Sequence, residues 1–81
     1  MIASLNGKVL SKKPEGIIID VNGVGYHVSI PLCNLADIPD KGETAFLHIY
    51  THVREDVLHL YGFVTEEDRK IFTTLIGIKH L

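Results

Sequence analysis

The chain has 81 residues, a formal net charge of −2 and a single cysteine, Cys33. This length predicts one domain, with a core near the lower limit for independent folding. The weakly acidic charge gives no compositional sign of nucleic-acid binding, and one cysteine excludes an internal disulfide and suits a reducing compartment. No apolar run is long enough for a membrane helix and no secretory signal opens the chain, so we expect a cytoplasmic protein without membrane contact.

The first 30 residues predict three strands. Residues 3–9 alternate apolar and polar side chains, and a polar turn over 12–16 follows them. Residues 17–21 are mostly β-branched, which favours a strand. The dipeptide Asn22-Gly23 then predicts a tight hairpin, because both residues tolerate the positive φ of a type I′ turn, and residues 24–30 return as the third strand.

Residues 31–42 interrupt this alternation and predict one or two helical turns that Pro39 ends. The apolar residues spaced for one side of these turns are Leu32, Leu35, Ala36 and Ile38. Residues 44–53 and 57–64 predict a fourth and a fifth strand, the fourth long enough to curve around a barrel. We therefore expect a mainly β fold over residues 1–64, the five-stranded Greek-key barrel called the OB-fold.

Residues 65–81 predict one C-terminal α-helix. Thr65 supplies an N-cap hydroxyl, and three acidic residues follow it at the positive end of the helix dipole. An apolar stripe comes next, at helical spacing, and is a candidate interface with the barrel, with a missing domain or with another subunit. The stripe consists of Ile71, Phe72, Leu75 and Ile76.

Glu55 and Asp56 form the predicted turn between the last two strands, directly after Arg54. Two adjacent carboxylates between apolar strands would make a rigid negative tip that repels phosphates. Spacing alone favours an ordinary solvated hairpin end over a functional one. Acid–base catalysis is disfavoured, because adjacent residues at an exposed tip are poorly placed to face one bond and no buried pocket raises either pKa.

Other candidate sites are weaker. His48 and His52 would be about 13 Å apart on a strand, too far to share one ion, so we expect no metal site, and we expect no cofactor or catalytic residue. Six aromatic side chains could stack on single-stranded bases, but without interleaved basic residues they are expected to fill the barrel or a subunit contact. These are Tyr26, Phe46, Tyr50, Tyr61, Phe63 and Phe72, and the candidate phosphate contacts are Lys8, Lys12, Lys13 and Arg54.

Four stretches resemble the N-terminal part of the RuvA family, and together they span nearly the whole chain. They are Met1-Ile2 with Leu5 and Gly7, Asp20-Val21-Asn22-Gly23-Val24-Gly25-Tyr26 followed by Pro31, Val53-Arg54-Glu55-Asp56 with Leu60-Tyr61-Gly62-Phe63, and Glu66-Glu67 leading to Phe72, Leu75 and Ile76. Ala3 departs from the glycine usual in the family. Lys79-His80-Leu81 stands where the family has Gly-Val-Gly-Pro, so we expect a C-terminally truncated chain, and the sequence leaves open whether His80-Leu81 are native.

The resemblance implies a non-catalytic subunit of the bacterial RuvA–RuvB complex, which recognises four-way (Holliday) junction DNA and promotes branch migration in recombination, DNA repair and the SOS response. It implies a homotetramer in which Glu55 and Asp56 form an acidic pin at the junction centre. ATP hydrolysis would belong to a RuvB-type ATPase, bound through a C-terminal domain absent here. Residues 65–81 would begin a helical domain whose helix-hairpin-helix motifs grip DNA phosphates.

Two other functions fit the residues without the resemblance. One is a stand-alone OB module that binds single-stranded nucleic acid through its Tyr and Phe side chains. The other is a protein-interaction domain that captures a partner or another copy through the apolar stripe of the C-terminal helix and has no affinity for DNA.

Overall fold

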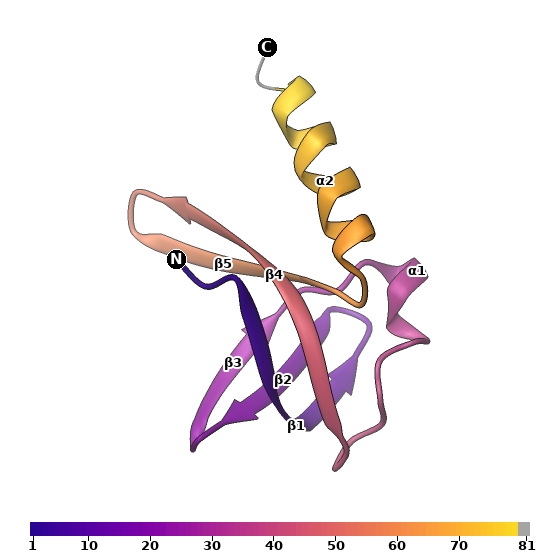
Figure 1. Ribbon diagram of the computed structural model, residues 1–81. Helices are drawn as coiled ribbons and strands as arrows, with labels where there is room; N and C mark the ends of the chain where they lie inside the picture. Colours follow the sequence, from indigo (N-terminus) through magenta and orange to yellow (C-terminus); the bar gives the residue numbers. More distant parts are fainter. Residues whose placement is uncertain (80–81) are drawn as a thin grey trace.

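In the computed structural model, which describes residues 1–79, five antiparallel strands form a nearly closed barrel followed by a helix (Figure 1). The strand order is β3-β2-β1-β4-β5, with a short helix between β3 and β4, so the expected OB-fold barrel is confirmed. His80-Leu81 lie outside the described residues. The elements are β1 (Ser4–Lys13), β2 (Gly16–Val21), β3 (Val24–Val28), α1 (Leu32–Leu35), β4 (Thr44–Arg54), β5 (Val57–Phe63) and α2 (Glu66–Lys79).

The barrel closes because β1 is shared between two neighbours and Ser29 joins the two edges. The first half of β1 pairs with β4 and the second half pairs with β2, with a register shift between Val9 and Ser11. Such a bulge bends a strand and increases its twist. On the other side, Ser29 N donates to Leu60 O at 2.9 Å, and Gly62 N donates to Ser29 O at 2.9 Å.

The Asn22-Gly23 hairpin forms as predicted. Val21 and Val24 are register partners, and the two residues between them have φ values of 52° and 88°. Positive φ at both central positions is the signature of the type I′ turn, whose twist matches that of the flanking strands. The dipeptide therefore fixes the register of β2 against β3.

Two local expectations differ from the structure. β1 continues to Lys13, which pairs with Gly16, so Lys12 and Lys13 are strand residues and only residues 14–15 make the turn. Helix α1 is a single turn in which Leu32 is 73% exposed, while Ile38 beyond the helix is buried. A four-residue helix has too few turns to present one continuous apolar face, so Leu32 and Ile38 lie in different surroundings.

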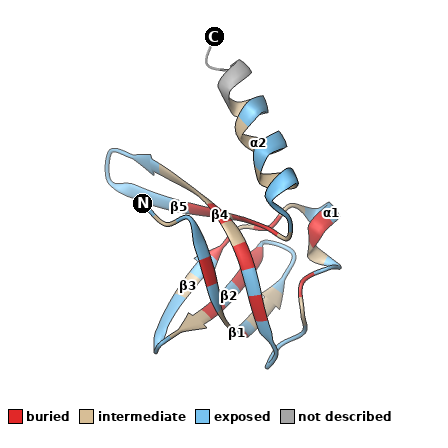
Figure 2. Cartoon of the chain, viewed as in Figure 1, coloured by how far each residue is buried: buried red, intermediate tan, exposed pale blue. Residues whose placement is uncertain are grey.

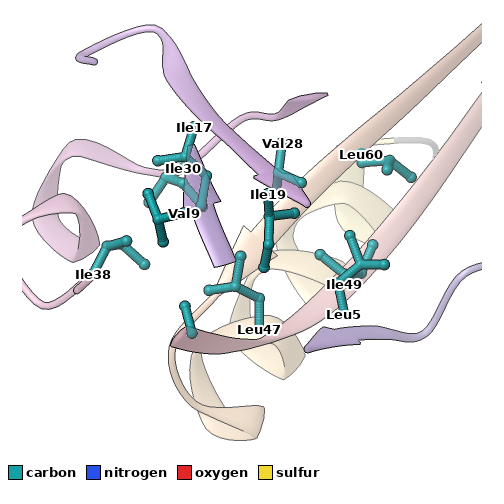
Figure 3. Packing of buried hydrophobic residues seen from close by; sticks show 11 residues of the cluster. Leu5, Val9, Ile17, Ile19, Val28, Ile30, Ile38, Leu47, Ile49 and Leu60 are labelled. Atoms are coloured by element: carbon teal, nitrogen blue, oxygen red, sulfur yellow. The ribbon is translucent and has the colours of Figure 1, made fainter. Parts of the chain in front are cut away.

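The core is aliphatic and lies between the barrel strands (Figures 2 and 3). Strand β4 shows the period-two pattern most clearly, because it buries Ala45, Leu47 and Ile49 at alternate positions. Of the aromatic side chains expected to fill the barrel or a subunit contact, Phe63 is buried and Tyr26 packs against the core, whereas Phe46 is exposed. The buried cluster consists of Leu5, Val9, Ile17, Ile19, Val28, Ile30, Ile38, Ala45, Leu47, Ile49 and Leu60.

Within residues 1–79, no helix has the length and apolar character required to cross a bilayer. Helix α2 is the longest helix, with 14 residues, and it leaves the barrel after β5 (Figure 1). Its start is capped, because the backbone N–H of Asp68 donates to the Thr65 hydroxyl at 3.1 Å. The predicted N-cap is thus confirmed.

Gly62 packs where a side chain does not fit, and this generates a stability prediction. A Cβ at Gly62 would lie 2.6 Å from Val28 Cγ1 and 2.8 Å from Ile30 Cδ1, inside the closed barrel. We expect Gly62→Ala to lower the free energy of unfolding by about 1–3 kcal/mol, the usual cost of overpacking a core. Urea denaturation measures this change in the free energy of unfolding. Gly25→Ala is the matched control, because its nearest neighbour would be Ile18 Cγ2 at an ordinary 3.5 Å; equal losses in both variants would contradict the packing explanation.

Candidate nucleic-acid interface

The β4–β5 hairpin extends beyond the barrel as an arm (residues 50–61) that ends in the predicted acidic turn (Figure 1). The two strands pair without a register shift from His48 opposite Phe63 to Arg54 opposite Val57. Pairing of β4 with β1 ends at Ser4 opposite His48, so the outer part of the arm is a two-stranded ribbon. Such a ribbon is marginally stable by itself and requires support at its base.

The N-terminal residues provide that support. Ile2 N donates to Thr51 Oγ1 at 3.0 Å, and the same hydroxyl donates to Ile2 O at 2.6 Å. One step further along, Ile49 N donates to Ala3 O at 2.8 Å. These bonds continue the contact with β4 through the residues before β1 and hold the base of the arm. The sequence pattern did not reveal this structural role of the N-terminal residues.

Glu55 and Asp56, here called the acidic tip, are the two turn residues at the end of the arm. Both are exposed. Glu55 has a φ of 29°, one of two positive values among the described non-glycine residues, the other being Asn22 in its hairpin. L-residues with long side chains rarely adopt this conformation, and residues held in it cluster at functional sites. The turn places both residues at the end of the arm, away from the barrel (Figure 1).

The two faces of the arm carry different side chains. Val53 and Leu58 are register partners on one face and are 69% and 60% exposed, although they continue the aliphatic side of the strands. The opposite face carries rings and a cation, which we call the aromatic face. It consists of Tyr50, His52 and Arg54 on β4 and Val57, His59 and Tyr61 on β5.

The predicted phosphate-binding residues are not brought together. Lys12 Nζ donates to Ile38 O at 2.8 Å and lies 3.6 Å from Asp40 Oδ1, so it ties the α1–β4 loop to β1. Lys8 pairs with Thr44, ten residues before Arg54 on the same strand, which places Lys8 and Arg54 about 30 Å apart along β4. Lys8, Lys13 and Arg54 are exposed. A single phosphate track through all four residues is therefore excluded.

The predicted stripe on α2 is divided between two environments. Phe72 packs on the barrel, with ring centroids 5.2 Å from Tyr61 and 5.0 Å from Phe63. Ile71 and Leu75 are 53% and 58% exposed and border an open apolar groove along α2, while Ile76 is half-buried. Only Ile71 and Leu75 are therefore fully available to a partner.

An ion-pair network holds the first turn of α2 against β4. Glu66 Oε2 lies 3.1 Å from His48 Nδ1, and Arg69 Nη2 donates to Glu66 Oε1 at 2.7 Å. The hydrogen bond from Arg69 lowers the pKa of Glu66 from its ordinary value, and the nearby charges of Arg69, His48 and Lys70 lower it further. The same bond raises the pKa of Arg69.

A family model described as the RuvA N terminal domain matches residues 1–62. The chain belongs to the RuvA family. A relative from Geobacter metallireducens is 50% identical over 78 residues, which cover 96% of this chain and 39% of that protein. Relatives from Geotalea daltonii and Solibacter usitatus are 49% and 47% identical over the same length. All three carry the name Holliday junction branch migration complex subunit RuvA.

The chain spans about two-fifths of the length of these RuvA relatives. The matched region includes the arm and most of its base, because the family model ends one residue before the last residue of β5.

Within residues 1–79, no three His, Cys, Asp or Glu side chains gather in a group able to hold a metal ion.

Sequence reasoning missed the aromatic face as a unit. His52 and His59 are register partners, and both rings belong to the ladder that includes Tyr50 and Tyr61. Even-numbered residues on β4 and odd-numbered residues on β5 share this face because the strands are joined by a two-residue turn. That parity rule could have revealed the face, whereas the histidines were assessed only as metal ligands.

The backbone conformation of Glu55 generates a stability prediction. We expect Glu55→Asn to be more stable than Glu55→Gln by about 1 kcal/mol, since asparagine tolerates left-handed backbone at lower cost. Both variants lose the same charge, so each is the control of the other for electrostatics. Thermal unfolding should separate them by roughly 4–8 °C at this size. Coincident melting temperatures would mean that the turn stores no strain.

The Glu66 network generates a pH prediction. Because the pKa of Glu66 is lowered in the folded state, its stabilising contribution is present above the unfolded pKa and is lost as the pH falls through the folded pKa. We expect the loss of melting temperature between neutral and acidic pH to be smaller in Glu66→Gln than in the unmodified chain. Glu67→Gln removes a charge one residue away and should leave the pH profile unchanged; identical profiles in both variants would contradict the role of Glu66.

Proposed function

We propose that this chain is the junction-recognition module of a RuvA-type subunit and that the acidic tip enters the centre of a four-way DNA junction. The observation that supports this most strongly is the placement of two exposed carboxylates at the end of a braced two-stranded arm, outside the barrel. The relatives named as branch-migration subunits share this region of the chain. The module supplies shape and charge and has no catalytic step of its own.

The physical effect of the tip is electrostatic exclusion. Carboxylates near duplex phosphates raise the free energy of the paired backbone, and the effect increases where water is partly excluded. Strands that cross at a junction centre separate more readily around such a tip, since separation moves their phosphates away from it. The same repulsion opposes the gain from counterion release at basic groups, so the tip favours selectivity for junction shape over affinity.

Four copies around one junction would multiply this effect, and the chain has surface for such an assembly. Val53 and Leu58 on the arm and Ile71 and Leu75 on α2 are exposed apolar side chains in two separate places. A head-to-tail ring needs two different patches on each subunit, and exposed apolar patches mark such contacts. We propose a homotetramer on this basis.

The remaining parts of the activity are assigned to a longer protein. We propose that α2 begins a helical domain whose helix-hairpin-helix motifs bind DNA phosphates, because Lys8, Lys13 and Arg54 are too widely separated to form one phosphate track here. A RuvB-type ATPase would supply the energy for branch migration through a further domain. A role in recombination and DNA repair in the bacterial cytoplasm follows from this assignment.

Neutralising the acidic tip should strengthen binding to linear duplex. For Glu55→Gln/Asp56→Asn we expect about a five- to tenfold higher duplex affinity, corresponding to roughly 1 kcal/mol of removed repulsion, and a smaller preference for a four-way junction over duplex. Competition gel shifts at a fixed ionic strength of about 0.15 M, where the Debye length is about 8 Å, measure both quantities.

The control variant Glu15→Gln/Asp37→Asn removes the same formal charge from exposed positions away from the arm. It should change duplex affinity by less than about twofold, since exposed charges beyond a Debye length are screened. Equal gains of duplex affinity in the two variants would mean that net charge, and not the position of the tip, causes the effect. An unchanged or lower duplex affinity after neutralising the tip would reject electrostatic exclusion.

A further inference from the structure

The aromatic face of the arm forms a connected ladder of rings that leads toward the acidic tip. His59 stacks on Tyr61 with centroids 5.4 Å apart and ring planes 17° apart. Tyr61 lies 6.3 Å from Tyr50, and Tyr50 lies 6.3 Å from His52. Arg54 follows His52 on the same face, at the last position before the turn.

The barrel does not need this ladder for its core. The buried cluster is wholly aliphatic and lies on the other face of β4 and β5, where Leu47, Ile49 and Leu60 are placed. Helix α2 covers only the end of the ladder near the barrel, through Phe72 against Tyr50 and Tyr61. Toward the tip the cover ends, and His59 is exposed.

We propose that the aromatic face is a stacking site for unpaired nucleobases, with the exposed ring of His59 as the platform, Tyr61 packed behind it, and Arg54 as the phosphate contact. Aromatic rings stack on any base and bind single strands without reading sequence, and a cation beside them contacts the backbone. This combination is present on one face of the arm and absent from the other, which carries Val53 and Leu58.

The acidic tip favours a single strand over duplex as the occupant. A duplex presents phosphates on its outside, and Glu55 and Asp56 would repel them. An unpaired strand can turn its bases toward the rings and keep its phosphates on the side of Arg54. The inference rests on the proposed function, since strands separated at the tip are the source of unpaired bases there. It adds a site that binds the separated strands to the repulsion that separates the strands.

The test uses a short single-stranded oligonucleotide with one 2-aminopurine, whose fluorescence falls when the base stacks on a ring. We expect quenching on titration with the chain. His59→Ala should weaken binding about fivefold, at the lower end of the range for one stacking contact, and His59→Phe should restore it. Arg54→Ala should weaken binding and flatten the salt dependence of the affinity by roughly 0.7 in log–log slope.

His27→Ala is the matched control, because His27 is an exposed histidine on β3, away from the arm. It should leave both quenching and affinity unchanged. Absent quenching, equal losses in His27→Ala and His59→Ala, or full affinity in His59→Ala would overturn the stacking site. Junction preference is measured separately with an unlabelled four-way junction: retained preference without quenching rejects only the stacking site, and quenching without preference rejects the proposed function.

Discussion

The uninterrupted pairing of β4 with β5 is the constraint on which the functional surface depends. Because the two strands are joined by a two-residue turn, their pairing determines both where the acidic residues lie and which side chains share a face. A shift of one residue would exchange the aromatic face with the aliphatic face, because side chains alternate along a strand. The hydrogen bonds between Ile2 and Thr51 protect this register at the base, where β1 no longer covers β4.

The arm combines repulsion and attraction within a few residues. In the proposed function, Glu55 and Asp56 would disfavour duplex at the end of the arm, while Arg54 and the rings behind it would offer contacts to a strand that has lost its partner. Lys8 and Lys13 are far from this end, and Lys12 is engaged with Ile38 and Asp40. These lysines therefore lie apart from the acidic tip and do not form one phosphate track with Arg54.

Local signals in the sequence predicted much of the fold. Asn22-Gly23 predicted its turn because only residues tolerant of positive φ fit there, and Thr65 predicted the start of α2 through its capping hydroxyl. The turn at Glu55 and Asp56 was correctly placed between two apolar strands, although glutamate is not typical of a position with positive φ. Their role as a pin came from family resemblance and stays a proposal.

The errors concern contacts between segments distant in sequence. The sequence placed Lys12 in a turn and among the candidate phosphate contacts. It did not reveal the bond from Lys12 to Ile38 O, because that bond depends on the path of the α1–β4 loop. Phe72 and Ile71 were grouped in one stripe, although the angle at which α2 meets the barrel separates them. The need for glycine at position 62 is equally non-local, since Val28 and Ile30 fill the space beside it.

Backbone ¹⁵N relaxation of the arm tests the central claim, a stiff arm with an anionic tip, most directly. The account predicts order parameters near 0.85 from His52 through Glu55 and Asp56 to His59, the range of a rigid backbone. Values below about 0.6 at the tip, with a rigid barrel beneath it, would describe a flexible loop and contradict the account. A flexible tip could not keep two carboxylates at a fixed place between crossing strands.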